Sequence, residues 1–458
     1  MTPEEFRRYG YQTIDWIADY LANPGRYPVV PRVKPGQLTD ALPACGPERG
    51  EPGEALLADF ERLVVPAMTH WNHPGFLAYF ANTSVPEAIL GEMLAAALNA
   101  NGMLWKTAPA VTELEQVALG WLRRWMGLPE DWFGLIYDTA SVSSMHAIAA
   151  ARQAADPDSR TRGVKPGLVV YTSEQAHSSI EKGAIAVGIG QNQVRKVPVD
   201  AEFRMRPDAL RAMVERDLAE GLRPACVSAT IGTTSTTSVD PVPAIAEICA
   251  RHGLWLHVDA AYAGAAAVAP EFRWAFEGCE HADSFVTNPH KWLLTPMDCS
   301  VFFTRRPDVL RQAFSLIPEY LRSDGDPRAV NLMDYGVPLG RRFRALKLWF
   351  VLRAYGREGI AEMIRSQAEM ARDLAREIDA DVRFERMAPV PFSVVNFRYR
   401  GTDQENQAIL ERVNASGEVF ISSTVLNGKF TLHIAIGNQG TTREHVRRAW
   451  ELVRAAPG

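Results

Sequence analysis

The sequence predicts an α/β protein with a largely parallel central sheet and a smaller α+β unit at its carboxyl end. Short apolar runs alternate with helical stretches through the middle of the chain, a pattern typical of a parallel sheet covered by helices on both faces. Beyond residue 340 this alternation gives way to a long helix, a strand, a helix and a hairpin. A length of 458 residues is enough for roughly two or three structural units.

The first element is an amphipathic helix. Apolar residues recur at near-helical spacing over residues 3–21, and the chain then becomes PGRYPVVPRVKPG, which is too rich in proline to continue the helix. An extended arm without a local partner must pack elsewhere, and in large enzymes such an arm often contacts a second subunit. We therefore expect residues 1–82 to form a helical dimerisation segment.

The central domain is expected to span residues 83–362. Its apolar runs are bounded by turn residues and rich in Val, Ile and Phe, and most are separated by a candidate helix. Ligands bind outside the carboxyl ends of the strands in such sheets, so the residues that end each run matter most. The predicted strands are 134–140, 167–173, 193–199, 225–232, 254–260, 284–289 and 299–305.

The last unit is expected over residues 363–458. A long helix from about 340 to 378 leads into it, and Asn427-Gly428 between two apolar runs is a strong hairpin signal. The final helix is expected to start at Thr441-Thr442, with Glu444 closing a capping box. The other elements expected are a strand at 392–400, a helix at 403–413 and a hairpin at 418–437.

Composition excludes several classes of function. Lys and Arg number 49 against 54 Asp and Glu, so a net charge of −5 gives no electrostatic footprint for nucleic acid or an anionic membrane. No apolar run approaches the roughly 18 residues of a membrane span. Five dispersed cysteines without a CxxC argue against disulfides and structural zinc, and we expect a cytoplasmic protein.

No metal site is expected either. His70 and His73 form an HxxH, but no acid or cysteine nearby completes a ligand set. A structural role, or a place in the substrate pocket, explains this pair better than metal binding does. We therefore expect a small molecule as the main partner.

Two residues at strand ends point to pyridoxal 5'-phosphate (PLP). Asp259 ends one run, and Lys291 follows the next run 32 positions later. PLP needs a lysine amine for a Schiff base and a carboxylate that keeps its pyridine nitrogen protonated, so that the ring can accept an electron pair. Two unit charges about 4 Å apart are worth about 4 kcal/mol at an effective dielectric of about 20. A turn-capping Asp and a solvated Lys are the alternative interpretation.

Three further strand ends supply groups that suit this cofactor. Thr139-Ala140-Ser141 lies between a strand and a helix, where backbone N–H groups bind phosphate, although an ordinary helix cap looks similar. His177 is placed to stack on a pyridine ring, but a single histidine at a strand end is more often structural. Thr234 closes a third strand with a hydroxyl, and Thr-rich loops are also common as turns.

Together these residues resemble the group II PLP decarboxylases, specifically the aromatic L-amino-acid decarboxylase family. The resemblance runs from about Phe6 to Trp450 and is carried by THWNHPGFLAYFANTS, WKTAPAVTELE, YTSEQAHSSIEKG, TIGTTSTTSVDPV, LWLHVDAAYAG, ADSFVTNPHKWLLTPMDCS and PLGRRFRALKLWFVLRAYG. It implies the type I, aspartate aminotransferase-like PLP fold and an obligate homodimer with a swapped N-terminal segment. It also implies a carboxy-lyase that acts on an aromatic amino acid.

The resemblance assigns roles to individual residues. Lys291 resembles the Schiff-base lysine, Asp259 the partner of the pyridine nitrogen, and His177 the stacking histidine. His290 corresponds to the active-site histidine beside the lysine. The phosphate and cofactor contacts implied are Thr139, Ala140, Ser141, Thr234 and Asn288.

The substrate pocket is implied by the same resemblance. Gly340 occupies a position where plant relatives have glycine with indolic substrates and serine with phenolic ones, so we expect tryptophan to be favoured. Phenylalanine, tyrosine and 3,4-dihydroxyphenylalanine remain open as substrates. Asn82 replaces a threonine that contacts the substrate ring, and Asp138-Thr139 replaces a Gly-Ser pair. The expected substrate contacts are Trp71, Tyr79, Phe80, Asn82 and Gly340.

The stretch from Ser315 to Gly340 has the composition of a long, lid-like functional loop. It contains Tyr320, which matches the family's catalytic tyrosine and would protonate the substrate carbon after carbon dioxide leaves. An aromatic acetaldehyde synthase, in which phenylalanine takes this position, is the alternative enzyme. A non-catalytic protein that keeps the cofactor fold is a more remote alternative.

Overall fold

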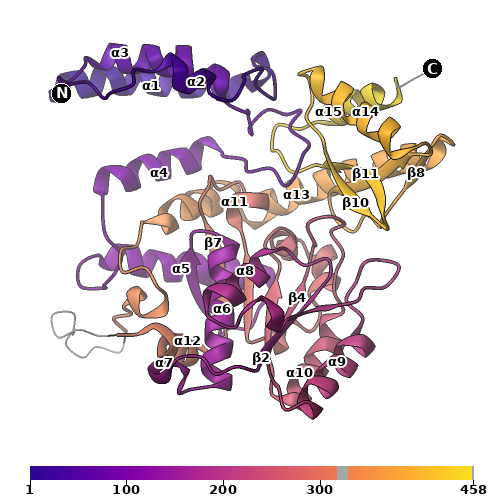
Figure 1. Cartoon of the computed structure of the whole chain (residues 1–458). Coiled ribbons are helices and arrows are strands. Elements are labelled where there is room, and N and C mark those ends of the chain that lie inside the picture. Colours follow the sequence, from indigo (N-terminus) through magenta and orange to yellow (C-terminus); the bar gives the residue numbers. More distant parts are fainter. Residues whose placement is uncertain (317–327, 456–458) are drawn as a thin grey trace.

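A seven-stranded sheet forms the centre of the computed structural model, which describes residues 1–316 and 328–455 (Figure 1). The strands lie in the order β1-β7-β6-β5-β4-β2-β3, and only β7 runs antiparallel to its neighbours β1 and β6. Each predicted run in this region is a strand. They are β1 (Phe133–Tyr137), β2 (Leu168–Ser173), β3 (Val194–Val197), β4 (Arg223–Thr230), β5 (Trp255–Asp259), β6 (Ser284–Thr287) and β7 (Ser300–Thr304).

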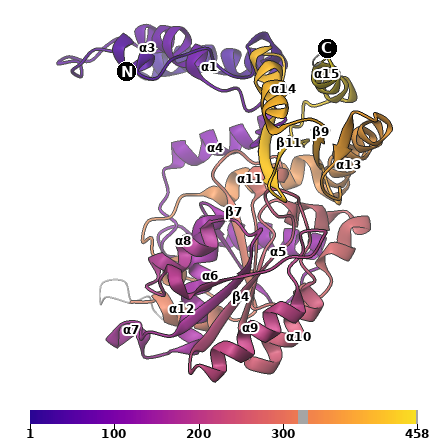
Figure 2. The same cartoon turned by 45° about the vertical axis from the view of Figure 1, so that its right-hand side comes forward.

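Helices cover both faces of this sheet. Alternate residues of β2 belong to two separate apolar clusters, with Val169 and Tyr171 in one and Leu168 and Val170 in the other. This alternation confirms the prediction of a sheet buried on both sides. The first cluster includes α5 (Pro109–Met126), α9 (Pro207–Ala219) and α10 (Val242–His252), whereas the second includes α6 (Ala140–Ala155), α8 (Ser179–Ala186) and α12 (Pro307–Phe314) (Figure 2).

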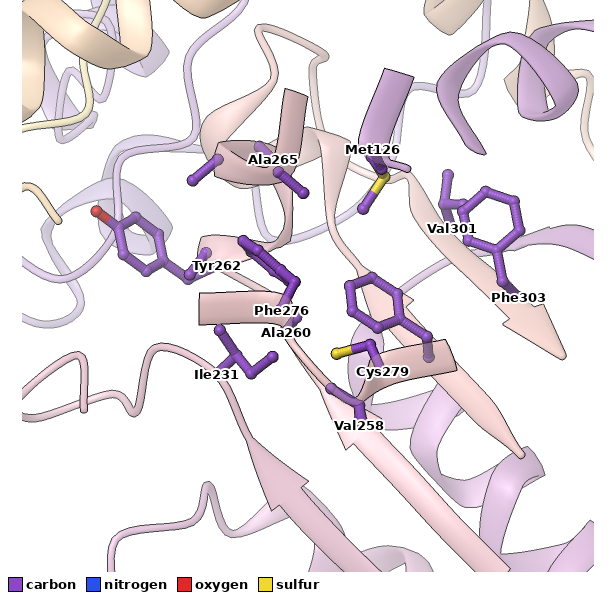
Figure 3. Close-up of a cluster of buried hydrophobic side chains, with 14 of the residues drawn as sticks. Met126, Ile231, Val258, Ala260, Tyr262, Ala265, Phe276, Cys279, Val301 and Phe303 are labelled. Atoms are coloured by element: carbon purple, nitrogen blue, oxygen red, sulfur yellow. The ribbon is translucent and has the colours of Figure 1, made fainter. Parts of the chain in front are cut away.

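The first cluster is the largest core. Figure 3 shows part of it, in which Met126 of α5 and Phe303 of β7 belong to the same cluster as Phe276 and Cys279. Tyr262 lies at the edge of this group with its hydroxyl directed away from it. The core therefore extends from the sheet to the segment that follows β5.

The N-terminal segment lies at one end of the molecule in both views (Figures 1 and 2). The predicted first helix is confirmed as α1 (Pro3–Ala22), which begins with a capping box between Thr2 and Glu5. Its Trp16 packs edge-on against Phe60, with ring centroids 4.9 Å apart. The short helices α2 (Gln37–Ala41) and α3 (Gly53–Asp59) and the longer α4 (Pro86–Leu98) complete this part.

The C-terminal unit has its own core and an antiparallel sheet of order β10-β11-β9-β8. The long helix α13 (Arg344–Ala380) enters it, with a break in helical geometry at Gly356, where φ is +61°. The predicted hairpin is confirmed. The unit contains β8 (Phe384–Arg386), β9 (Val394–Tyr399), β10 (Ser422–Leu426), β11 (Lys429–Ala435), α14 (Asp403–Ala415) and α15 (Arg443–Arg454).

The prediction for the start of the last helix was wrong in one detail. The capping residue is Thr442, and its backbone N–H donates to Nδ1 of His445 (3.1 Å). The helix therefore starts one residue later than a box closed by Glu444 requires, and Glu444 pairs with Arg447 instead. A histidine nitrogen can accept this bond just as a carboxylate does.

Within the two stretches of chain that the structure describes, no helix combines the length and apolarity needed to cross a bilayer.

Candidate active site

Four of the five predicted catalytic residues, His177, Asp259, His290 and Lys291, meet at one edge of the central sheet. Strands β4, β5 and β6 are parallel neighbours, so their carboxyl ends lie together. A cavity of about 180 Å³ opens there. It is lined by Phe80, Thr139, Ala140, Ser141, His177, Ser179, Thr230, Gly232, Thr234, Asp259, Ala261, Tyr262, Asn288, His290 and Lys291.

Lys291 lies in the short helix α11 (Pro289–Trp292), directly after β6. Its Nζ lies 5.2 Å from the ring centroid of Phe80. Burial lowers the pKa of this amine, and the negative charge of Asp259 opposes that shift. A lysine in such surroundings more readily provides the neutral amine that attacks a carbonyl carbon.

Asp259 is the last residue of β5 and is almost completely buried. Its Oδ1 accepts a hydrogen bond from the backbone N–H of Ala261 (3.1 Å), which fixes the carboxylate at the carboxyl end of β5. It is paired in register with Thr230 at the end of β4. A carboxylate fixed in this way supplies a negative charge to a ligand in the cavity.

Two histidines line the cavity in defined orientations. The backbone N–H of Ser179 donates to Nδ1 of His177 (3.1 Å), and the backbone N–H of Cys299 donates to Nδ1 of His290 (2.9 Å). Each neutral ring therefore carries its proton on Nε2. Burial, reinforced by the charge of Lys291, lowers the pKa of His290 to about 4, so this ring is uncharged at neutral pH.

The pKa of His177 is also lowered. Desolvation by surrounding atoms is the main cause, the charge of Asp259 opposes it, and Lys291 adds to it. His177 is exposed and lines the cavity. A flat, uncharged ring at this point is suited to stacking on an aromatic ligand.

The beginning of α6 offers a site for an anion. Ala140 and Ser141 occupy its first turn, where backbone N–H groups have no partner inside the helix. Thr139 precedes them as the capping residue but makes no side-chain capping bond within the described chain. The Thr139 N–H instead donates to the carboxylate of Asp138 (2.5 Å).

The polar lining of the cavity fits PLP. Asn288 Oδ1 and Thr230 Oγ1 are buried and have no hydrogen-bond partner among the residues that the structure describes. Buried polar atoms are almost always paired, so unpaired ones that line a cavity indicate a ligand that pairs them. A helix N-terminus for phosphate, a lysine amine and a carboxylate complete the set of groups that PLP requires.

The segment that carries Phe80 is held by the C-terminal unit. The backbone N–H of Leu77 donates to Phe420 (2.8 Å), and that of Phe420 donates to Gly75 (2.9 Å). Ala435 in β11 donates to Leu77 in the same way (2.9 Å). Phe80 therefore enters the cavity from a segment that is attached to the second core.

Other predicted substrate contacts lie outside this cavity. Trp71 and Asn82 line a separate cavity of about 580 Å³ together with aromatic side chains of the N-terminal segment. Tyr79 is 56% exposed, and the position of a Cβ at Gly340 would meet only Asn101 Nδ2, at 3.9 Å. Tyr320 lies outside the described residues.

The histidines of the HxxH pattern have structural roles. His70 stacks on Tyr27, with ring centroids 4.6 Å apart, and its Nδ1 lies 3.1 Å from the hydroxyl of Tyr20. Nδ1 of His73 accepts the backbone N–H of Gly75 (2.9 Å). Both rings thus fix the conformation of the segment that precedes Phe80.

Sequence reasoning missed five residues of the cavity wall. Tyr262 is the largest of them, and it lies only three positions after Asp259. Proximity in sequence to a strand-end carboxylate was the signal available for it and for Ala261. The remaining three are Ser179, Thr230 and Gly232, each next to a predicted residue or strand end.

Comparison with known proteins agrees with this geometry. The pyridoxal-dependent decarboxylase conserved domain matches residues 35–400. Mouse aromatic-L-amino-acid decarboxylase is 40% identical over 471 residues, which cover 99% of this chain and 97% of the mouse protein.

Two solved structures extend the comparison. Oryza sativa TDC, solved with PLP and tryptamine, is 37% identical with a TM-score of 0.96, covering 99% of this chain and 98% of the rice chain. Rhodiola rosea 4-hydroxyphenylacetaldehyde synthase is 34% identical with a TM-score of 0.93, covering 99% and 98%. The type I PLP fold expected from the sequence is thereby confirmed. The chain belongs to the pyridoxal-dependent decarboxylase family and, within it, to the aromatic-L-amino-acid decarboxylases, which makes it a PLP-dependent carboxy-lyase.

Proposed function

We propose that the chain decarboxylates an aromatic L-amino acid to its amine and carbon dioxide, with tryptophan as the favoured substrate. The observation that carries this proposal is the gathering of Lys291, Asp259 and His177 around one cavity at the strand ends. The names of the mouse decarboxylase and of the tryptamine-bound rice structure support the aromatic substrate class.

We assign the cofactor contacts from the cavity lining. Lys291 supplies the amine that holds PLP covalently, and the first turn of α6, with Thr139, Ala140 and Ser141, binds its phosphate. Asn288 and Thr234 supply further polar contacts. The bound cofactor provides an aromatic system that accepts the electron pair left on the substrate carbon when carbon dioxide departs.

The protein's own residues tune that chemistry. The buried carboxylate of Asp259 keeps a pyridine nitrogen protonated through its negative charge. His177 would stack on the aromatic system of the cofactor as an uncharged ring. His290 presents an Nε2–H donor from a fixed orientation, because its Nδ1 is occupied by the Cys299 N–H. Asp259 therefore supplies a negative charge, His290 a proton on Nε2, and His177 an uncharged ring while the cofactor is bound.

Tryptophan is favoured because of Gly340. The position has no side chain, and the space around it is open, since the nearest atom to an added Cβ would be Asn101 Nδ2 at 3.9 Å. In plant relatives glycine here accompanies indolic substrates. An open wall admits the larger indole ring but excludes smaller rings weakly, because shape alone discriminates by only about 1–3 kcal/mol per missing group. We therefore expect incomplete selectivity.

We further propose that the working enzyme is a homodimer. Trp71, Tyr79, Asn82 and Gly340 do not line the cavity formed by Lys291 and Asp259 within one chain. A second copy that packs on this side would bring its own residues to the open part of the site. The five free cysteines, four of them buried, support the cytoplasm as its location.

The test is a product assay of the purified PLP-loaded enzyme. Carbon dioxide, amine and aldehyde are measured with tryptophan, tyrosine, phenylalanine and 3,4-dihydroxyphenylalanine as separate substrates. We expect stoichiometric amine and carbon dioxide, with the highest kcat/KM for tryptophan. A higher kcat/KM for tyrosine would contradict the substrate assignment, and absence of carbon dioxide from all four would contradict the reaction.

The second candidate is an aromatic acetaldehyde synthase, favoured by the similarity to the Rhodiola rosea enzyme. Tyr320 distinguishes the two, because a phenol is a suitable proton donor to the substrate carbon and phenylalanine is not. We predict that Tyr320→Phe, in the presence of dioxygen as the oxidant and water, shifts the products from amine towards aldehyde, ammonia and hydrogen peroxide, measured by chromatography and a peroxidase assay. The unchanged enzyme is the control. Aldehyde as its main product, or amine alone at a normal rate from the variant, would contradict this role.

A further inference from the structure

We propose that Tyr262 is a positioning residue for Lys291, acting through a column of three stacked aromatic rings. The ring of Tyr262 lies 3.9 Å from that of Phe80, at an interplanar angle of 13°. On the other side it lies 4.8 Å from Trp292, at 12°. Tyr262 is therefore the middle ring of a nearly parallel column.

Both ends of this column meet Lys291. Trp292, the ring at one end, is its neighbour in the chain. At the other end, Nζ of Lys291 lies over the ring of Phe80, 5.2 Å from the centroid. The backbone beside the lysine and its terminal nitrogen are thus connected through three rings, so a displacement of the middle ring reaches the lysine from both directions.

Polar contacts fix the planes of the rings. The hydroxyl of Tyr262 is hydrogen-bonded to Oγ of Ser393, and Nε1 of Trp292 donates to Oε1 of Gln367 (2.5 Å). Both partners belong to the C-terminal half of the chain, and Figure 3 shows the Tyr262 hydroxyl pointing out of the first core. Only 3% of Tyr262 and 1% of Trp292 are exposed, so neither ring has room to turn.

The column has a direct consequence for the amine. The face of an aromatic ring attracts a cation by its quadrupole, most strongly where water is excluded. Phe80 supplies that face, and it keeps its orientation because Tyr262 supports it from behind. Loss of the Tyr262 ring frees Phe80 to turn and removes a wall of the cavity, so the lysine amine is no longer held at one position.

This inference rests on the proposed role of Lys291 as the cofactor-binding lysine. The experiment compares Tyr262→Leu, which removes the ring, with Tyr262→Phe, which keeps the ring and loses only the hydroxyl. Tyr171→Leu is the matched control, because Tyr171 is equally buried in β2, bonded to Asp217, and absent from the cavity wall. The readouts are the dissociation constant of PLP, the visible absorption band of the lysine-bound cofactor, and kcat and KM measured separately.

We expect Tyr262→Leu to weaken PLP retention by about tenfold, because the cation–ring contact at Phe80 is weakened but not removed. Its absorption band should change in position or width, and kcat should fall more than KM rises. Tyr262→Phe should restore PLP retention to within about twofold, because the ring contact is kept. Tyr171→Leu should lower the unfolding temperature but leave the PLP dissociation constant and the band unchanged.

Two outcomes overturn the proposal: a Tyr262→Leu variant with unchanged band and PLP retention, or one that matches Tyr171→Leu in every readout. If Tyr262→Leu does not fold, Phe80→Leu removes the ring that contacts the lysine and must reproduce the loss of PLP retention. Lys291→Ala separates this inference from the proposed function. Persistence of the lysine-bound band in that variant contradicts the function itself, whereas its loss leaves the role of Tyr262 to be decided by the Tyr262 variants.

Discussion

Lys291 lies where burial and charge act in opposite directions on its amine. Burial lowers its pKa by disfavouring the ammonium form, and the buried carboxylate of Asp259 works against this. The ring of Phe80 also favours the charged form. Burial is the larger of these effects, so the pKa of the amine is lowered, and the neutral form that attacks a carbonyl carbon is easier to reach than in a solvated lysine.

Lys291→Ala should abolish turnover and leave the chain folded. The lysine is held by surrounding structure rather than holding it, since no salt bridge to it exists within the described chain. We expect loss of carbon dioxide release and of the lysine-bound absorption band, with thermal unfolding close to that of the parent. Lys182→Ala, an exposed lysine on the neighbouring α8, is the control for loss of charge. Carbon dioxide release by Lys291→Ala at a tenth of the normal rate or more would contradict the assignment.

Gly340→Ser should shift selectivity towards phenolic substrates. The added side chain meets no backbone atom, because Asn101 Nδ2 at 3.9 Å is the nearest atom to the Cβ position, so the fold should tolerate it. A hydroxyl at this wall can pair with a phenol and narrows the space for an indole. We expect the ratio of kcat/KM for tryptophan to that for tyrosine to fall by about tenfold. An unchanged ratio, with unchanged thermal stability, would show that Gly340 does not select the substrate.

The site was predictable where a reactive side chain lies at or just after the end of a strand. Asp259 ends its strand, and His177 and Lys291 each follow a strand by four residues, so sheet topology brings them to one edge. The sequence position of Tyr262 after Asp259 indicates a place near the site, but its stacking role was not predictable, because that role depends on which rings lie on its two faces. Phe80 and Trp292 are far from it in sequence, and no periodicity brings them together.

At the scale of elements, helix packing depends on close approach between α4 and α13. A Cβ at Gly91 would lie 2.8 Å from Cα of Lys347 and 3.1 Å from its nitrogen. Both atoms are backbone, so the helices must move apart to admit a methyl group. Gly120, in α5, has no atom within 4 Å of its Cβ position.

These two glycines should therefore respond to alanine with opposite signs. Gly91→Ala should lower the free energy of unfolding by about 1–3 kcal/mol through overpacking. Gly120→Ala should raise it by about 0.5–1 kcal/mol, because alanine is the better helix former. Urea denaturation followed by circular dichroism checks both variants. Equal stability of the two would contradict the close packing of α4 on α13.

Strands and helices with a clear apolar pattern were predictable from the sequence, and those without one were not. The seven runs of the central sheet have sharp turn boundaries, and Asn427-Gly428 marks the hairpin between β10 and β11. The reversed direction of β7 was not predictable, because a strand buried on both faces reads the same either way. Strand β8 was missed because it has only three residues, of which Phe384 alone is buried.

At the scale of the whole molecule, the cavity is built on the first core but depends on contacts with the C-terminal unit. The central sheet contributes Asp259 and Lys291, while the segment that carries Phe80 is hydrogen-bonded to the C-terminal sheet through Leu77. The ring of Tyr262 packs with the first core, and its hydroxyl bonds to Ser393 outside it. The two units therefore need to be correctly docked for the site to exist.

The helix α4 has an exposed apolar face. The four residues concerned lie on α4, spaced so that they share one side of the helix: Leu90, Met93, Leu94 and Leu98, which are 48%, 41%, 51% and 64% exposed. Clusters of exposed apolar side chains on a helix indicate a protein interface. Because α4 directly follows the segment that carries Phe80 and Asn82, we propose that a second copy covers α4 and approaches the site.

The double variant Leu94→Glu, Leu98→Glu should therefore be monomeric and inactive. Two carboxylates in an apolar interface cost more than the contacts they replace, because they are desolvated without partners. Sedimentation velocity gives the oligomeric state, and carbon dioxide release gives the activity. Val382→Glu is the control, since Val382 is 86% exposed and lies after α13 in the C-terminal unit. That variant should remain dimeric and active. A parent protein that sediments as an active monomer, or a double variant that keeps both dimer and activity, would show that α4 does not form the interface that completes the site.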